Sequence, residues 1–169
     1  IKLIYGTDTN NTEYVVDTYL MNELESIGDL DIKNVNEISS EDWDGSDLFV
    51  LGIPTWYDGE LQSDWEEYFE EFKTIDFTGK TVAIFGLGDQ LGYQEWFCDG
   101  IGILGEVILN SGGKLVGYTK NDDSYDLDIE PKCLINSDTF YGLCIDEDNQ
   151  SELTQERVEK WVNQIKNEF

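Results

Sequence analysis

The aromatic residues of one short segment are the first candidates for chemistry. Residues 54–59 read Pro-Thr-Trp-Tyr-Asp-Gly and follow the apolar run 47–53. The carboxyl ends of strands in a parallel α/β sheet open into a crevice where ligands bind, so an aromatic side chain there can stack on a flat ligand. Trp56 could equally be a core residue, because the chain has five tryptophans. Two further segments bear on that choice.

Residues 6–12, Gly-Thr-Asp-Thr-Asn-Asn-Thr, have the composition of an anion site. They lie between an apolar strand, residues 1–5, and a helical apolar pattern. That pattern comprises Val16, Leu20, Leu24 and Ile27. Unpaired backbone amides and the positive end of the helix dipole would both face a phosphate, and no base lies between Gly6 and Glu13. An ordinary N-cap of Ser, Thr or Asn type is the alternative.

The third segment, residues 86–93, reads Gly-Leu-Gly-Asp-Gln-Leu-Gly-Tyr and follows the apolar strand 81–85. It brings a second aromatic side chain, Tyr93, to a strand end. Three such segments at consecutive strand ends predict one ligand crevice.

Other reactive groups are few. The chain has no histidine, which removes the usual base of nucleophilic triads and the commonest zinc ligand. Cys98, Cys133 and Cys144 lack Cys-x-x-Cys spacing and are expected to be free thiols. The acids between residues 122 and 130, Asp128 included, lack the spacing of a calcium loop and indicate a surface loop rather than a metal site. The reacting group is therefore expected to be a cofactor.

The elements that would position these segments alternate between strand and helix five times. Further strands are expected at 31–35 and at 114–118, the latter resuming at 139–145 after a polar insertion. Helices are expected from Ser63 as N-cap, over 101–109 with a Ser111-Gly112-Gly113 stop, and at the end of the chain. The apolar face of the last helix comprises Val158, Trp161, Val162, Ile165 and Phe169. This alternation predicts an α/β fold with a doubly wound, five-stranded parallel sheet.

The three segments, in this order, resemble the motifs of the flavodoxin family: Thr-x-Thr-Gly-x-Thr, Pro-Thr-Trp-x-x-Gly and Gly-Asp-Gln-x-Gly-Tyr. The resemblance extends to Asp146–Gln150 before the last helix, and Asn121–Asp138 looks like the insertion of the long-chain subfamily. It implies one flavodoxin-like domain over residues 1–169, with strand order 2-1-3-4-5 and a fifth strand interrupted by the insertion.

The resemblance also implies flavin mononucleotide (FMN) as the cofactor, with phosphate at residues 7–12 and the ring between Trp56 and Tyr93. Asp146 would lie near the ribityl chain, and Asp58 would adopt a positive φ in the reduced protein. The residues placed at the cofactor are Thr7, Asp8, Thr9, Asn10, Asn11, Thr12, Pro54, Thr55, Trp56, Tyr57, Asp58, Gly59, Leu87, Gly88, Asp89, Tyr93, Trp96, Phe97, Cys98, Asp99 and Asp146.

Four of these residues depart from what the family pattern or the phosphate favours. Asn10 replaces Gly, and Asn is among the residues that best tolerate a left-handed backbone. The Asp8 carboxylate is unfavourable beside a phosphate unless it points to solvent. Trp96 and Cys98 stand where the family carries polar amides, which leaves backbone donors there.

The implied function is that of a low-potential one-electron carrier that substitutes for ferredoxin, and not of an enzyme. An FMN-dependent NAD(P)H or quinone reductase on the same fold is the alternative, and it needs open space over one ring face. A phosphorylatable receiver domain is excluded, because its acceptor Asp is absent at residues 53–55, Ile-Pro-Thr.

The net charge of the chain limits the classes of partner that it can bind. A net charge of -27, from 37 acids and 10 bases, disfavours nucleic acid and anionic membranes and favours basic redox partners such as ferredoxin–NADP reductase or photosystem I. Adaptation to high salt would explain the acidity equally well, and the acidic face of helix 64–71 can be a docking patch or a solvated face. Without an apolar run near about 18 residues or a signal peptide, the protein is expected to be a cytoplasmic monomer, or stromal if a plastid transit peptide has been removed.

Overall fold

The computed structural model describes residues 1–127 and 129–169, so Asp128 lies outside the described residues. Its main sheet is parallel, in the order β10-β5-β3-β1-β2. These strands are β1 (Lys2–Tyr5), β2 (Asp31–Asn34), β3 (Phe49–Trp56), β5 (Thr81–Leu87) and β10 (Leu143–Ile145). The short strand β4 (Glu60–Leu61) pairs antiparallel with β3. The predicted order 2-1-3-4-5 is confirmed.

The fifth strand is interrupted, as expected. β6 (Lys114–Val116) pairs with the beginning of β5, and β10 pairs with its end. Between them the chain forms a small antiparallel sheet of β7 (Thr119–Lys120), β9 (Thr139–Phe140) and β8 (Leu134–Asn136). The predicted run 139–145 therefore divides between two sheets. Gly142 lies at the division, where a Cβ would overlap the backbone of Ile84.

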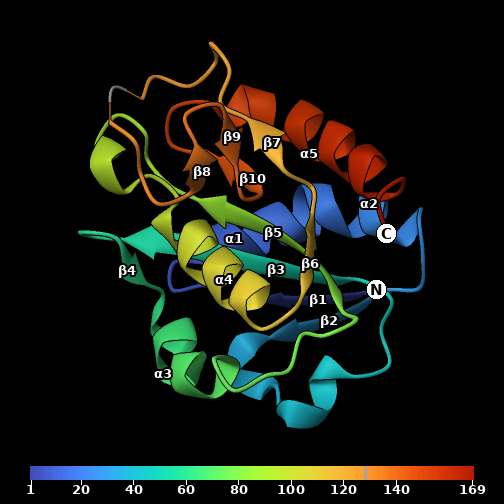
Figure 1. The fold of residues 1–169 in the computed structure, drawn as a ribbon. Coiled ribbons are helices and arrows are strands. Elements are labelled where there is room, and N and C mark those ends of the chain that lie inside the picture. Colours follow the sequence, from blue (N-terminus) through green and yellow to red (C-terminus); the bar gives the residue numbers. More distant parts are fainter. Residues whose placement is uncertain (128) are drawn as a thin grey trace.

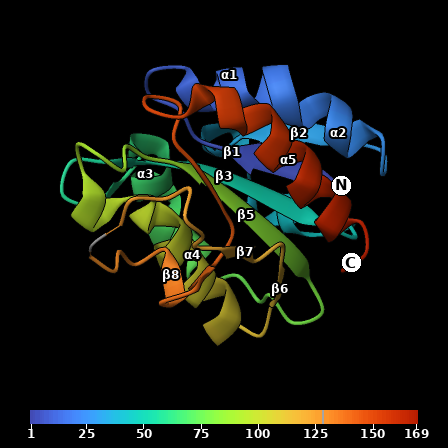
Figure 2. The ribbon, with the colours of Figure 1, turned by 90° about the horizontal axis from the view of Figure 1, so that it is seen from above.

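Helices cover both faces of the main sheet (Figures 1 and 2). On one face, α1 (Asn11–Val15), a π-helical turn (Val16–Leu20) and α2 (Met21–Glu25) form one continuous helical segment beside α5 (Ser151–Ile165). On the other face lie α3 (Ser63–Phe72) and α4 (Asp99–Asn110). Among the described residues, no helix is both long and apolar enough to cross a membrane.

Each face has its own core because the central strands are buried on both sides. Leu3, Val50 and Phe85 pack with Trp161 of α5, whereas Ile4, Leu51 and Ile84 pack towards α3 and α4. Trp43, Trp65 and Trp161 are buried, but Trp56 and Trp96 are partly exposed. The core interpretation therefore holds for three of the tryptophans and fails for Trp56.

Several predicted boundaries were wrong, and three of them affect the site or the core. β3 continues through Pro54 to Trp56, because Thr55 and Trp56 pair with β4, so the loop itself is only residues 57–59. The N-cap of α3 is Gln62 and not Ser63, because the buried Gln62 Oε1 accepts the Trp65 N–H at 3.2 Å. Phe169 lies beyond α5 and is 41% exposed, so it is not part of the core face.

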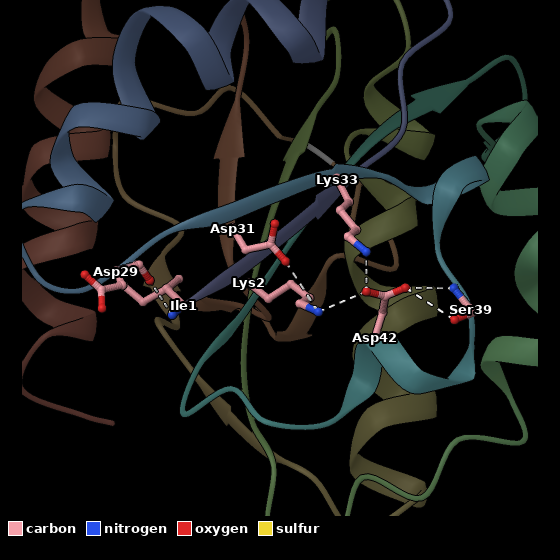
Figure 3. Close-up of polar contacts among 7 residues, drawn as sticks. All are labelled: Ile1, Lys2, Asp29, Asp31, Lys33, Ser39 and Asp42. Atoms are coloured by element: carbon pink, nitrogen blue, oxygen red, sulfur yellow. Dashed lines mark hydrogen bonds and ion pairs between the residues drawn. The ribbon is translucent and has the colours of Figure 1, made fainter.

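An ion-pair cluster ties the first strand to the turn before β3 (Figure 3). Asp42 Oδ1 accepts from Lys2 Nζ at 3.0 Å and from Lys33 Nζ at 2.6 Å, and its other oxygen accepts from the Ser39 amide at 3.0 Å. The hydrogen bond from Lys33, followed by that from the Ser39 backbone, holds the pKa of the Asp42 carboxyl well below its usual range. This cluster, termed the Asp42 clamp, joins β1, β2 and the segment 39–43.

Candidate functional site

A cleft of about 190 Å³ opens at the carboxyl ends of β1, β3 and β5. All three segments singled out in the sequence contribute to it. Its lining residues are Thr7, Thr9, Asn11, Thr12, Pro54, Thr55, Trp56, Tyr57, Leu87, Gly88, Asp89, Tyr93, Glu147 and Asp148. The parallel sheet thus brings together side chains that are up to about 140 positions apart, as strand ends in this fold class do.

Residues 6–12 form a tight turn into α1. A Cβ on Gly6 would overlap the Gln62 side chain, so only glycine allows this approach to α3. Asn10 adopts a left-handed backbone, with φ 65° and ψ 6°, which confirms that Asn takes over the conformational role of glycine here. No side chain caps the N-terminus of α1. The amides of its first turn therefore have no capping side chain, which is the condition for an anion site at a helix N-terminus.

Unpartnered polar atoms gather in this cleft. Within the described part of the chain, four buried side-chain polar atoms lack a hydrogen-bond partner, and three of them belong to Thr7 (Oγ1), Thr12 (Oγ1) and Trp56 (Nε1). Leaving such a group unpaired costs about 1–3 kcal/mol each, so native proteins rarely cluster them. The three atoms fit a ligand that supplies oxygen or nitrogen partners. No Lys or Arg lies among the lining residues, so an anion would be held by neutral donors.

Asp8 is turned away from the cleft. Its Oδ1 accepts from Ser63 Oγ at 2.6 Å and from Gln62 Nε2 at 2.9 Å. The carboxylate contacts the start of α3 and Asp8 is exposed to solvent, which meets the condition stated for an acid beside a phosphate. This contact keeps the charge out of the lining.

The aromatic side of the cleft is built on the hairpin between β3 and β4. Trp56 ends β3, and its ring centroid lies 6.2 Å from that of Tyr57, which is 67% exposed. In the three-residue loop, Tyr57 has φ 42° and Gly59 has φ 84°. The positive φ expected for Asp58 in the reduced protein is thus found here at its two neighbours.

The loop after β5 forms another side of the cleft. Gly88 permits a close approach, because a Cβ there would lie 2.8 Å from the Cys98 amide nitrogen. Burial disfavours the charged form of Asp89, but hydrogen bonds from Gly92, Asn149 and Leu91 outweigh this and lower the pKa of its carboxyl. Tyr93 is half exposed at the rim.

Residues 96–99, which were predicted to lie at the cofactor, do not line the cleft. Phe97 is buried against Tyr125, and Cys98 is fully buried with φ 53°, so burial raises the pKa of its thiol. Asp99 Oδ1 accepts the Lys132 amide at 2.7 Å. Asp99 also lies close to Gly59, because a Cβ on Gly59 would be only 2.7 Å from Asp99 Oδ2. Burial raises the pKa of the Asp99 carboxyl.

The segment before α5 provides two lining residues that were not among the predicted site residues. Asp146, which was predicted, is fully buried and accepts from Gln90 Nε2 at 2.9 Å and from the Asn149 amide at 3.0 Å. Its neighbours Glu147 and Asp148 line the cleft instead. Burial, followed by the charges of Asp89 and Asp146, raises the pKa of the Asp148 carboxyl. The run of acids at 146–148 indicated that this segment could reach the cleft, but the sequence did not show which of the three acids would line it.

The cleft therefore combines neutral hydrogen-bond donors, aromatic side chains and carboxylates. Such a site can bind a flat molecule with an anionic tail. Its lining has no histidine or thiol.

Comparisons with known proteins agree with this geometry. The family model described as Flavodoxin matches residues 3–161. A flavodoxin of Haemophilus influenzae is 46% identical, with 100% of this chain and 95% of that protein covered, and flavodoxin 1 of Escherichia coli is 43% identical, with 99% and 93% covered. A crystal structure of Fusobacterium nucleatum flavodoxin bound to flavin mononucleotide superposes with a TM-score of 0.91 at 35% identity, covering 99% of this chain and 97% of that one.

Proposed function

The chain belongs to the flavodoxin family, and from this premise we propose that the cleft binds FMN as a one-electron redox cofactor. The observation that carries the proposal is the pair of buried, unpartnered hydroxyls of Thr7 and Thr12 at the uncapped start of α1, beside the unpartnered indole N–H of Trp56. These atoms match a ligand with a phosphate at one end and polar ring edges at the other.

Within this proposal the lining residues divide by chemistry. Thr7, Thr9, Asn11 and Thr12 hold the phosphate with neutral donors and the helix dipole. Trp56 and Tyr93 contact the flavin ring, and the backbone from Leu87 to Asp89 borders its polar edge. The cleft of about 190 Å³ is smaller than the roughly 300–1,000 Å³ typical of small-molecule pockets, so part of the ligand stays exposed. An exposed edge beside Tyr57 and Tyr93 allows electrons to pass to a docked protein.

The protein is an electron-transfer protein and not an enzyme, in line with its family. When bound, FMN supplies the one-electron chemistry. The chain's contribution is electrostatic: Asp89, Glu147 and Asp148 line the cleft and no base does, so added negative charge on the ring is disfavoured by Coulomb repulsion. This field makes the carrier a strong reductant.

As a redox carrier the protein interacts with redox partners. We propose that these partners are basic, of the ferredoxin–NADP reductase or photosystem I type, and that their acceptors are those otherwise served by ferredoxin. The proposal treats residues 1–169 as one domain that acts as a monomer. Its three free thiols suit a reducing compartment such as the cytoplasm.

Reconstitution and turnover test the proposal. FMN should bind the FMN-free protein at one equivalent, and the flavin fluorescence should be quenched on binding. The loaded protein should pass electrons from a basic reductase to a cytochrome. NAD(P)H oxidation by the loaded protein alone would contradict a carrier role and favour the reductase alternative. Stoichiometric binding of riboflavin as tight as that of FMN would contradict the phosphate assignment.

A further inference from the structure

A second cavity lies between α5 and the small sheet that contains β7, two elements that are neighbours in Figure 1. Its volume is about 290 Å³, larger than that of the cofactor cleft, and the two share no lining residue. It is lined by Thr119, Lys120, Asp122, Ser124, Tyr125, Leu143, Leu153, Glu156, Arg157, Lys160, Trp161 and Gln164.

The cavity concentrates positive charge in a strongly acidic protein. Lys120, Arg157 and Lys160 are three of the chain's 10 bases, although the net charge is -27. Arg157 Nη1 is buried without a hydrogen-bond partner. Its other terminal nitrogen, Nη2, donates to Ser124 Oγ at 2.9 Å and to Gln150 Oε1 at 2.7 Å, which fixes the guanidinium in place. An unpaired buried donor on a fixed cation is a preorganised place for an anion.

The acids of the lining offset only part of this charge, although Asp122 interacts electrostatically with Arg157 and Lys160. Glu156 pairs with Lys160 one turn away along α5. Asp122 Oδ1 accepts from the amide and hydroxyl of Ser124 and, within the described residues, forms no ion pair with these cations. Among the described residues, neither Arg157 nor Lys120 forms an ion pair. Two cations therefore remain available.

Four lining residues, Tyr125, Leu143, Leu153 and Trp161, form the apolar and aromatic part of the cavity, and the polar side chains of Thr119 and Gln164 already donate to backbone carbonyls. Leu143 and Trp161 are almost fully buried, and the Trp161 indole N–H already donates to the Gly117 carbonyl. The Tyr125 ring lies 4.3 Å beneath the Arg157 guanidinium. A water takes up about 30 Å³, so the cavity has room for a molecule of roughly ten non-hydrogen atoms.

We propose that this cavity is a second ligand site, which binds a small organic anion: one carboxylate or phosphate group held by Arg157 and Lys120, on a flat apolar body packed against Leu143, Leu153 and Trp161. The proposal does not depend on what the cofactor cleft binds, because none of these residues reaches that cleft.

Titrations of the FMN-loaded protein followed by amide NMR shifts test the site, because FMN keeps added anions away from Thr7 and Thr12. The probes are benzoate, phenyl phosphate and inorganic phosphate at constant ionic strength. Benzoate or phenyl phosphate should give saturable shifts at residues 119–125 and 153–164, with a Kd on the order of 1 mM. Whichever of the two binds more tightly identifies the anionic group. Inorganic phosphate should bind at least about tenfold more weakly, because it lacks the apolar body.

Charge variants complete the test. The substitution Lys120→Gln should weaken the binding of the organic anion about fivefold, and Arg157→Lys should weaken it further by removing the fixed planar donor. The matched control is Lys166→Gln, an exposed base at the end of the same helix, which should leave the affinity unchanged. Absence of saturable shifts, equal affinity for inorganic phosphate, or equal weakening by the control would overturn the proposal.

Discussion

At the scale of single residues, the site is recognised by what its side chains lack. Buried hydroxyl and indole groups almost always have partners in folded proteins, yet Thr7, Thr12 and Trp56 have none among the described residues. Each therefore lowers the stability of the ligand-free protein and raises its affinity for a ligand that completes the hydrogen bonds. The same atoms therefore destabilise the ligand-free fold and favour ligand binding.

That opposition gives a prediction for Thr12→Val, a change of nearly equal volume. Losing one donor to the phosphate should weaken FMN by about 1.5–3 kcal/mol while leaving riboflavin almost unaffected. The FMN-free variant should unfold at equal or higher urea concentration than the parent, because an unpaired buried hydroxyl has gone. Fluorescence titration and urea unfolding measure the two effects. Thr139→Val, on β9 outside the cleft, is the control and should leave FMN affinity unchanged.

Tyr57 gives a prediction about backbone strain. It has φ 42° and a largely exposed ring, and a left-handed backbone costs a non-glycine residue about 1 kcal/mol. Tyr57→Gly should therefore raise the free energy of unfolding of the FMN-free protein by about 1 kcal/mol relative to Tyr57→Ala, which removes the ring but keeps the Cβ. Urea unfolding decides it. Equal stability of the two variants would show that the loop stores no strain at this residue.

At the scale of elements, the sequence predicted those parts of the fold that depend on local pattern. Continuous apolar runs gave β1, β3 and β5, and the left-handed position was correctly assigned to Asn10. The errors occurred where distant contacts decide. Gln62 caps the helix because its side chain is fully buried and its side-chain carbonyl oxygen, Oε1, accepts the Trp65 amide. The choice of Glu147 and Asp148 over Asp146 depends on Gln90 and Asn149 occupying the Asp146 carboxylate. Gln90 is 56 positions away, so the pattern of residues 146–150 does not contain its contribution.

The Asp42 clamp gives a prediction at this scale. The pKa of Asp42 is lowered in the folded protein, so its contribution to stability is fully present above the unfolded value of 3.8 and is lost as the pH falls towards the folded value. Asp42→Asn should lower the free energy of unfolding at neutral pH by about 1–3 kcal/mol, since Lys2 and Lys33 lose a shared partner. The gap between variant and parent should close as the pH falls below 3.8.

Urea unfolding at a series of pH values measures that gap. The matched control is Asp44→Asn, which breaks the ion pair with Lys80; the Asp44 side chain is 81% exposed. Exposed pairs contribute roughly 0–1 kcal/mol, so the control should be nearly neutral at every pH. A gap for Asp42→Asn that stays constant down to low pH would show that packing, and not the charge, stabilises the clamp.

At the scale of the whole molecule, the question is whether the charge of -27 serves docking or only solubility. The N-terminus of α3 contacts the Asp8 loop through Gln62 and Ser63, so the acidic face of α3 begins beside the cleft. Glu66, Glu67 and Glu71 on this helix are exposed, and Glu70 alone of the helix's acids pairs with a base, Lys73, within the described chain. Exposed Tyr57 and Tyr93 line the cleft. Unpaired charge next to an apolar contact area is the arrangement that steers a basic partner to the cofactor.

Steering predicts a specific salt dependence. The second-order rate of electron transfer to a basic reductase should be highest at low salt and fall as the Debye length shrinks to about 10 Å at 0.1 M. The double variant Glu66→Gln, Glu67→Gln should lower the low-salt rate and flatten the salt dependence. The control Glu23→Gln, Glu25→Gln removes the same charge at the far end of the α1–α2 segment, roughly 20 Å along the helix. The control should have a smaller effect on both. Stopped-flow rates over a salt series measure both pairs. Equal effects of the two pairs would assign the rate to net charge alone, and a rate independent of salt would leave adaptation to high salt as the explanation of the acidity.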